Sequence, residues 1–491
     1  MRIVAGMVTE AANGAGSGTA RRLFPLLLGI FGAVSGRSDV LPARSSYLLL
    51  DDRVVDRAEH VQLKVGSVAK HPANPLFKED RPWEVRFDNV YPNLAYDAQT
   101  RRYVCWYSPF IVDELTAATP KEKRAGVPYH STPTREMALC YATSADGIHW
   151  EKPDLGVVEF DGGRKNNLVL RASHGAGVLW DRAEKDPARR YKVFGGRQIP
   201  GQKRRFQVAF SLDGIHWSDP VLCPEIGVEG DTHNNAIWAP ALGKYVGITR
   251  RWLAGQRLVM RSESTDFTHW TPAQEIMRGD EENQTYAMPI FSYRDLYLGL
   301  VMVISLKTDR VSCELAWSPD TVSWRRVDAG HALIPNSNVP GDYDWGCVYA
   351  GTGPVTEGDE IRLYYGASNG PHTAWRDSFL ALATLRTDRF AGYAAGENAG
   401  VIITQPIALT GNQLVLNLEA PQGEVGVEVL DSDLAPVDGF SGERAAVVSG
   451  IDGIATPVAW RGGAGLGSLG HGAVRFKFTL QRAKLYSFGL R

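Results

Sequence analysis

The sequence lacks the signatures of several common protein classes. Its five cysteines form no CxxC pair, so we interpret them as buried free thiols rather than as a disulfide framework or a metal site. Lysine and arginine are scattered apart from dense runs at 121–124 and 203–205, and the formal net charge is −2, which disfavours nucleic acid as a partner. No segment after residue 40 is apolar for long enough to span a membrane, and no sizeable segment has a helical period.

We interpret residues 1–40 as an export signal rather than as part of the fold. Arg21 and Arg22 precede an apolar run at 23–34, which is too short to cross a bilayer but suits the apolar centre of a signal peptide. Small residues before Gly36 suit a cleavage site. The arginine pair resembles the twin-arginine export signal, so we expect a secreted or periplasmic protein. A disordered N-terminal extension is the alternative.

An internal repeat is the strongest signal in the remaining chain. The string SADGIHW ending at Trp150 returns as SLDGIHW ending at Trp217, and weaker copies end at Trp270 and Trp324. The copies are therefore separated by 67, 53 and 54 residues, a period typical of β-propeller blades. Asp-Gly favours a tight turn between antiparallel strands, and the tryptophan can cover the contact between neighbouring blades. The histidines of these strings are therefore interpreted as structural.

Short alternating runs between the repeats have the pattern of β-strands. Four copies of the repeat and five candidate inner strands predict five blades over residues 41–398. From about Gly400 the repeat is absent, and alternating runs such as 425–430 and 474–478 predict an antiparallel β-sandwich over 399–491. We therefore expect an all-β protein, a five-bladed β-propeller followed by a C-terminal β-sandwich.

The repeated turn, the five blades and the trailing sandwich together resemble the glycoside hydrolases related to invertase, inulinase, levansucrase and arabinanase. The segment 385–390, which leads through Gly400 to Thr404-Gln-Pro, is similar to the link those enzymes use into their sandwich. The resemblance covers roughly residues 60–491. It implies three carboxylates at one end of the propeller axis: a nucleophile or base in the first blade, a second aspartate, and a glutamate that donates the proton.

The sequence departs from the motifs of the better-known members of that group. It has no Asn-Asp-Pro-Asn-Gly in the first blade, no Arg-Asp-Pro in the second and no Glu-Cys in the third. Carboxylates nevertheless precede several predicted inner strands, and inner strands of a propeller converge on one funnel. We therefore predict Asp88 as base or nucleophile, Glu282 as acid and Asp231 as the modulating partner. Polar and aromatic residues at the same openings are predicted to bind substrate, namely Trp83, Glu84, Asn89, Tyr91, His174, His233, Asn234, Arg250, Tyr286, Asp344 and Trp345.

The predicted function is hydrolysis of a furanose-rich or other plant, algal or microbial glycan. A non-catalytic glycan-binding propeller is the main alternative, because the three signature motifs are absent, and phosphorolysis or transglycosylation is a third. No cofactor is expected and no residue spacing demands a metal, although the resemblance leaves open a structural calcium ion in the central channel. The expected partner is an oligo- or polysaccharide, without nucleic acid or a stable membrane span; the oligomeric state stays open.

Overall fold

The computed structural model describes residues 40–199, 201–463, 465–470 and 472–491. The predicted export signal therefore lies outside the described residues, except for Val40. The described chain is nearly all β, as expected. It contains one α-helix, α1 (Glu114–Ala118), and the short 3-10 helices η1 (Lys121–Lys123), η2 (Pro187–Arg189), η3 (Pro224–Ile226), η4 (Gly442–Arg444) and η5 (Leu466–Leu469). No helix among the described residues is long and apolar enough to cross a membrane.

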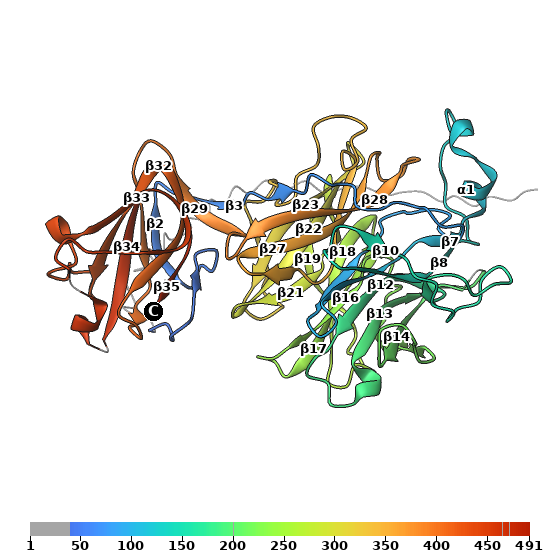
Figure 1. Ribbon diagram of the computed structural model, residues 1–491, viewed down its shortest axis with the longest axis horizontal. Coiled ribbons are helices and arrows are strands. Elements are labelled where there is room, and N and C mark those ends of the chain that lie inside the picture. Colours follow the sequence, from blue (N-terminus) through green and yellow to red (C-terminus); the bar gives the residue numbers. More distant parts are fainter. Residues whose placement is uncertain (1–39, 200, 464, 471) are drawn as a thin grey trace, which may run out of the picture. The chain divides into compact units, whose positions relative to one another are not determined.

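Five groups of antiparallel strands follow one another along the chain (Figure 1). The first contains β5 (Asn93–Asp97), β6 (Arg102–Tyr107), β9 (Leu139–Ser144), β10 (Trp150–Glu151) and β11 (Leu168–Leu170). The second contains β12 (Ser173–Trp180), β13 (Tyr191–Arg197), β14 (Arg205–Ser211) and β15 (Val221–Leu222). The third contains β16 (Asn235–Ala239), β17 (Lys244–Leu253), β18 (Gln256–Ser264) and β19 (Gln274–Arg278).

The fourth and fifth groups are joined by a parallel pairing of Val311 with Cys347. The fourth contains β20 (Asn283–Ala287), β21 (Ile290–Tyr293), β22 (Leu296–Ser305), β23 (Arg310–Ser318) and β24 (Arg325–Val327). The fifth contains β25 (Cys347–Ala350), β26 (Val355–Glu357), β27 (Glu360–Ser368) and β28 (Ser378–Arg386), and its last strand is β4 (Ala69–Lys70) from the N-terminal end. A separate pair, β7 (Phe110–Val112) and β8 (Glu136–Met137), flanks the loop that carries α1.

The four copies of the repeat form the same turn, because each aspartate caps the backbone that follows it. Asp146 Oδ1 accepts hydrogen bonds from the N–H groups of Ile148 and His149 at 2.8 Å each. Asp213, Asp266 and Asp320 do the same in their copies. The next residue has a positive φ in every copy, namely Gly147 at 76°, Gly214 at 75°, Phe267 at 63° and Thr321 at 67°. Because each histidine ring lies 2.7 Å from its own aspartate, the structural interpretation of these histidines is confirmed.

Each turn also contacts the strand group that precedes it in the chain. These contacts join Trp106 to Gly214, Phe194 to Trp270, and Arg261 to Thr321. The turn of the first group contacts the fifth, since the Tyr364 hydroxyl donates to the Gly147 carbonyl at 3.0 Å. Asn93 of the first group likewise forms a parallel bridge with Thr352, which follows β25 in the fifth. The groups are therefore in contact in cyclic order.

The C-terminal strands form a separate ten-stranded sheet that also takes strands from the N-terminal side. Its members are β1 (Tyr47–Leu48), β2 (Val55–Glu59), β3 (Gln62–Val65), β29 (Ala391–Ala395), β30 (Gly400–Thr404), β31 (Ile407–Ala408), β32 (Leu414–Leu430), β33 (Ala446–Pro457), β34 (Ala473–Gln481) and β35 (Ala483–Leu490). Figure 1 shows the blue strand β2 among the red C-terminal strands, where it pairs with β30. Residues 47–65 thus belong to this sheet, although the predicted domain boundaries assign them to the propeller segment.

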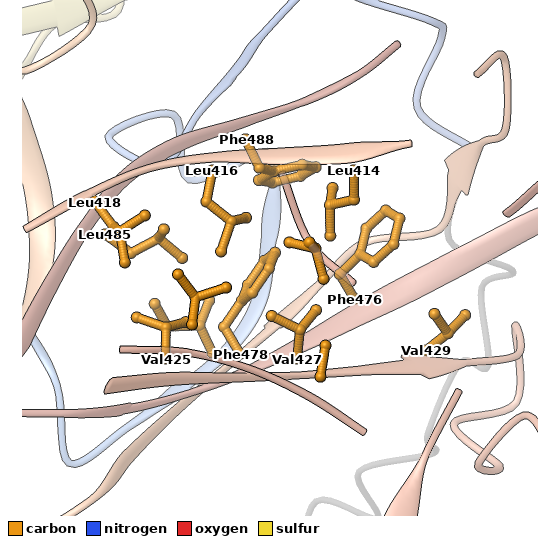
Figure 2. Close-up of a cluster of buried hydrophobic side chains, with 14 of the residues drawn as sticks. Leu414, Leu416, Leu418, Val425, Val427, Val429, Phe476, Phe478, Leu485 and Phe488 are labelled. Carbon is orange, nitrogen blue, oxygen red and sulfur yellow. The ribbon is translucent and has the colours of Figure 1, made fainter. Parts of the chain in front are cut away.

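Strand β32 bends so that its two halves pair with different strands. Its first half pairs with β35 and its second half with β34. In the second half, Val425, Val427 and Val429 are buried and alternate with partly exposed residues, as a strand with one covered face requires, whereas residues 414–418 of the first half are all buried. Figure 2 shows Leu414, Leu416 and Leu418 turned toward Val425, Val427 and Val429, with Phe476 and Phe478 between the two rows. The core of the C-terminal sheet is therefore enclosed between its own two halves.

All five cysteines are free and buried, which confirms their interpretation as structural thiols.

Candidate functional site

One cavity of about 480 Å³ receives side chains from all five strand groups. Its walls come from the segments before β5, β16 and β28, from strands β7, β12 and β20, and from the β17–β18 hairpin. The loop between α1 and β8 contributes the remaining side. The lining residues are Asp88, Tyr91, Phe110, Tyr129, His130, Ser131, Arg135, His174, Asp231, Arg250, Trp252, Arg257, Tyr286, His372 and Thr373. Six of them, Asp88, Tyr91, His174, Asp231, Arg250 and Tyr286, are predicted site residues.

Asp88 is an ionised carboxylate with one oxygen engaged. Its Oδ1 lies 2.5 Å from the Arg376 guanidinium and 3.6 Å from that of Arg86. Burial raises the pKa of Asp88, but the charges of Arg376 and Arg86 outweigh it and hold the pKa well below its usual value. Among the described residues no group donates a hydrogen bond to its Oδ2, and the side chain is 20% exposed. Asp88 therefore offers one free, negatively charged acceptor to the cavity.

Asp231 is also ionised, but both of its oxygens are engaged. Oδ1 lies 3.0 Å from His174 Nε2 and 2.8 Å from the Arg204 guanidinium, and Oδ2 lies 3.1 Å from that of Arg250. Burial raises the pKa of Asp231, yet Arg250, His174 and Arg204 together bring it well below its usual value. The pKa of His174 falls to about 4, because the ring is buried and lies near Arg204. Asp231 thus holds His174 and Arg250 in place at the cavity wall.

The cavity contains more guanidinium charge than its carboxylates neutralise. Neither Arg135 nor Arg257 has a carboxylate partner among the described residues; they donate instead to the Tyr129 hydroxyl at 3.1 Å and to Gln284 Oε1 at 2.9 Å. Their Nε atoms are buried and have no hydrogen-bond partner. Burial and the neighbouring Arg250 lower the pKa of Arg257. The site is therefore electropositive in spite of its two aspartates.

Aromatic side chains form the floor and the rim of the cavity. Tyr91 and Tyr286 are buried, and both hydroxyls accept hydrogen bonds from Asn89 Nδ2, at 2.7 and 3.0 Å. Asn89 itself lies behind them, where its Oδ1 accepts from Arg376. Trp252, at the tip of the β17–β18 hairpin, is 56% exposed and projects at the rim. An exposed indole of this kind can stack on the apolar face of a sugar ring.

The structure does not bring Glu282, the predicted acid, into this cavity. Glu282 is exposed in the turn before β20, where its backbone N–H donates to Asp280 Oδ1 at 2.9 Å. It is not a lining residue of the cavity that contains Asp88 and Asp231. Asp280, Glu281 and Glu282 are exposed in this turn, and Tyr286 is the residue of the fourth group that lines the cavity.

Seven other predicted residues, among them Asn89, lie outside the lining in buried or half-buried contacts within the protein. Trp83 donates to Asn167, and Glu84 accepts from Tyr107, Lys152 and two backbone N–H groups. The His233 ring is tilted against Tyr91, with 5.0 Å between the ring centroids, and its nitrogens face Ala350 and Asn93. Asn234 Nδ2 donates to three backbone carbonyls. Asp344 is fully buried against Lys70 at 2.6 Å. Trp345, which is half-buried beside Arg310, does not line the cavity either.

Several lining residues were not predicted from the sequence, notably Arg135, Trp252, Arg257 and His372. Trp252 and Arg257 flank an Ala-Gly turn, so a hairpin tip with an exposed tryptophan was a usable signal. Arg135 and His372 come from long loops, and nothing in their local sequence distinguishes them. Among the described residues, no group of three or more histidine, cysteine, aspartate or glutamate side chains is placed to hold a metal ion.

No known protein family and no curated protein matches this sequence. Solved structures to which this chain is similar include a glycosyl hydrolase from Bacteroides ovatus, at 15% identity and a TM-score of 0.44, over 66% of this chain and 95% of that one. An N-acetylgalactosamine deacetylase from F. plautii is 12% identical with a TM-score of 0.44, over 67% and 97% of the two chains. A glycoside hydrolase from the family of mannoside phosphorylases is 15% identical with a TM-score of 0.43, over 65% and 94%. The function is therefore inferred from the cavity itself.

Proposed function

We propose that this protein is a glycan-active enzyme, a glycoside hydrolase whose reaction takes place in the cavity lined by Asp88 and Asp231. The observation that carries the proposal is that these two ionised carboxylates come from different strand groups and line one cavity. Glycosidic cleavage uses a pair of carboxyl groups about the scissile bond. Trp252 at the rim provides an apolar surface for a sugar ring.

The contacts of the two aspartates support different roles for them. Asp88 is the base or nucleophile in this proposal, because its Oδ2 is charged and free of hydrogen-bond donors. Asp231 is the modulating partner, because His174, Arg204 and Arg250 occupy both of its oxygens. The substrate in this proposal is a plant, algal or microbial glycan.

A non-catalytic glycan-binding protein is the second candidate, and one observation favours it. Glycosidases need a protonated group to release the leaving oxygen. Both lining carboxylates are held ionised by arginines, and Glu282 lies outside the cavity. A cavity that binds a glycan without cleaving it needs no such donor.

We also propose that the five strand groups, which span residues 69–386, form a five-bladed β-propeller, and that the ten-stranded C-terminal sheet, which includes residues 47–65 and β29, is a β-sandwich. The cyclic contacts of the repeated turns support the propeller, as does the Asn93–Thr352 bridge between the first and fifth groups. The bent strand β32, whose halves enclose one apolar core, supports the sandwich.

The test is release of reducing ends from a panel of glycans by the full chain and by Asp88→Asn. Cleavage by the native protein and its loss in the variant is the expected result. Retained glycan binding without any released product would replace the hydrolase by the binding function. Glycan cleavage that is equal in the two proteins would remove Asp88 from the reaction.

A further inference from the structure

A second groove, of about 730 Å³, adjoins the cavity and continues its wall. The two share Asp231, Arg250 and Trp252 as lining residues. The groove runs along the start of β14, the loop before β16 and the β17–β18 hairpin. Its other lining residues are Lys203, Arg204, Arg205, Phe206, Cys223, Pro224, Gly227, Val228, Glu229 and Arg251. A chain longer than the cavity would therefore continue into this groove.

The groove is basic, although the whole chain has a formal net charge of −2. Arg204 is neutralised by Asp231 at 2.8 Å, and Lys203 lies 3.4 Å from Glu229. Arg205 and Arg251 have no carboxylate partner among the described residues: they donate to Gln202 and to the Gly227 carbonyl, at 3.4 Å each. The run at 203–205 thus forms one wall of the groove.

Uncompensated arginines therefore occur on both sides of Trp252. Arg135 and Arg257 are on the cavity side, and Arg205 and Arg251 are on the groove side. Arg257 is also 4.3 Å from the Trp252 ring, which places a guanidinium beside the surface available for stacking. Holding like charges together is unfavourable without counter-charge, and guanidinium groups pair with carboxylate and sulfate oxygens in a bidentate manner. The arrangement is therefore suited to several negative charges spaced along one ligand.

We propose that the ligand of this site is an anionic glycan, with carboxylate or sulfate groups on successive sugars that pair with Arg257 in the cavity and with Arg205 and Arg251 in the groove. This inference rests on the proposed glycan-binding function and names its substrate class. Trp252 stacks on a sugar ring at the junction, and the arginines on either side take the charged substituents. Neutral glycans supply no partner for these arginines.

The experiment measures binding separately from cleavage. The full chain is titrated calorimetrically with polygalacturonate, with sulfated carrageenan and with neutral arabinan, at low and at high NaCl. The expected result is tighter binding of at least one anionic polymer than of arabinan, weakening as salt screens the charges. The Arg205→Gln/Arg251→Gln variant alters one exposed and one half-buried position, and it is expected to lose roughly tenfold in affinity for that polymer. Arg257→Gln tests the cavity side in the same way.

Arg278→Gln is the matched control, since Arg278 belongs to the same strand group, is 54% exposed and pairs with Glu275 outside both spaces. It should bind the anionic polymer as the native chain does. Equal or tighter binding of arabinan, or an anionic preference that survives in both test variants, would overturn the inference. Cleavage of a neutral glycan that requires added inorganic phosphate would also overturn it, because the arginines would then bind free phosphate. Binding of the anionic polymer without reducing-end release would sink the hydrolase proposal and leave this one standing.

Discussion

Replacing Asp88 by asparagine tests the buried ion pair behind the cavity. The asparagine amide has the shape of the carboxylate and still offers one oxygen to Arg376, but it removes the negative charge of Asp88. The Arg376 side chain, which is 0% exposed, then has no counter-charge at this position. Breaking a buried ion pair costs about 3–5 kcal/mol, and losing a hydrogen bond to a charged group costs about 1.5–3 kcal/mol. Asn89 and the amide oxygen still accept from Arg376, so we expect a loss of about 3 kcal/mol in the free energy of unfolding, where the two ranges meet.

The same substitution removes the free, charged acceptor from the cavity. A positioned general base contributes roughly 10²–10⁴-fold to a rate. Turnover of a cleaved glycan by folded Asp88→Asn protein is therefore expected to fall by at least about a hundredfold. The assays are urea unfolding followed by tryptophan fluorescence, and reducing-end release at a temperature where both proteins are fully folded.

Asp344→Asn provides the control for a loss of stability alone. Asp344 is also buried and ion-paired, to Lys70 at 2.6 Å, but it does not line the cavity. That variant should be destabilised while its folded fraction keeps the native turnover. The reasoning is refuted if the urea midpoint of Asp88→Asn equals that of the native protein, because the buried Arg376 would then not need the charge of Asp88 for stability. Native turnover by the variant would refute the role of Asp88 in catalysis.

Four further outcomes are expected. Glu282→Gln should keep turnover within about twofold of native, since the side chain is exposed outside the cavity; a large loss would reinstate it as the acid. Trp252→Ala should weaken glycan binding in calorimetry without lowering the unfolding midpoint, because the indole is 56% exposed. Burial lowers the pKa of His174 from 6.5 to about 4, so the contribution of the neutral ring to stability is complete above pH 6.5 and is lost as the pH falls toward 4. The urea midpoint of His174→Gln should therefore depend less on pH over that range than the midpoint of the native protein. Arg21→Lys/Arg22→Lys should retain the protein in the cytoplasm in a cell-fractionation assay, and continued export would contradict the twin-arginine interpretation.

Much of the local structure was predictable because neighbouring residues determine it. Each of the four repeated turns depends on an aspartate that accepts hydrogen bonds from the backbone N–H groups two and three residues further along the chain, so these contacts span only a few positions. The placement of Asp88 and Asp231 before inner strands was also readable from strand pattern and spacing. By contrast, Glu282 also precedes an inner strand, as Asp231 does, but it does not line the cavity. Position relative to a strand does not determine the direction of a side chain in an irregular turn.

The sequence by itself determined the all-β character, the repeated turns and two of the carboxylates, because each follows from alternation, turn chemistry or a cap within a short segment. Only the tertiary structure decided which charges meet. Asp88 and Arg376 are separated by 288 residues, and Asp231 and His174 belong to different strand groups. The tertiary structure likewise decides that residues 47–65 pair with the C-terminal strands. The edge of a sheet can pair with any strand whose apolar and polar residues alternate suitably, and the fold of the whole chain selects the segment that lies there.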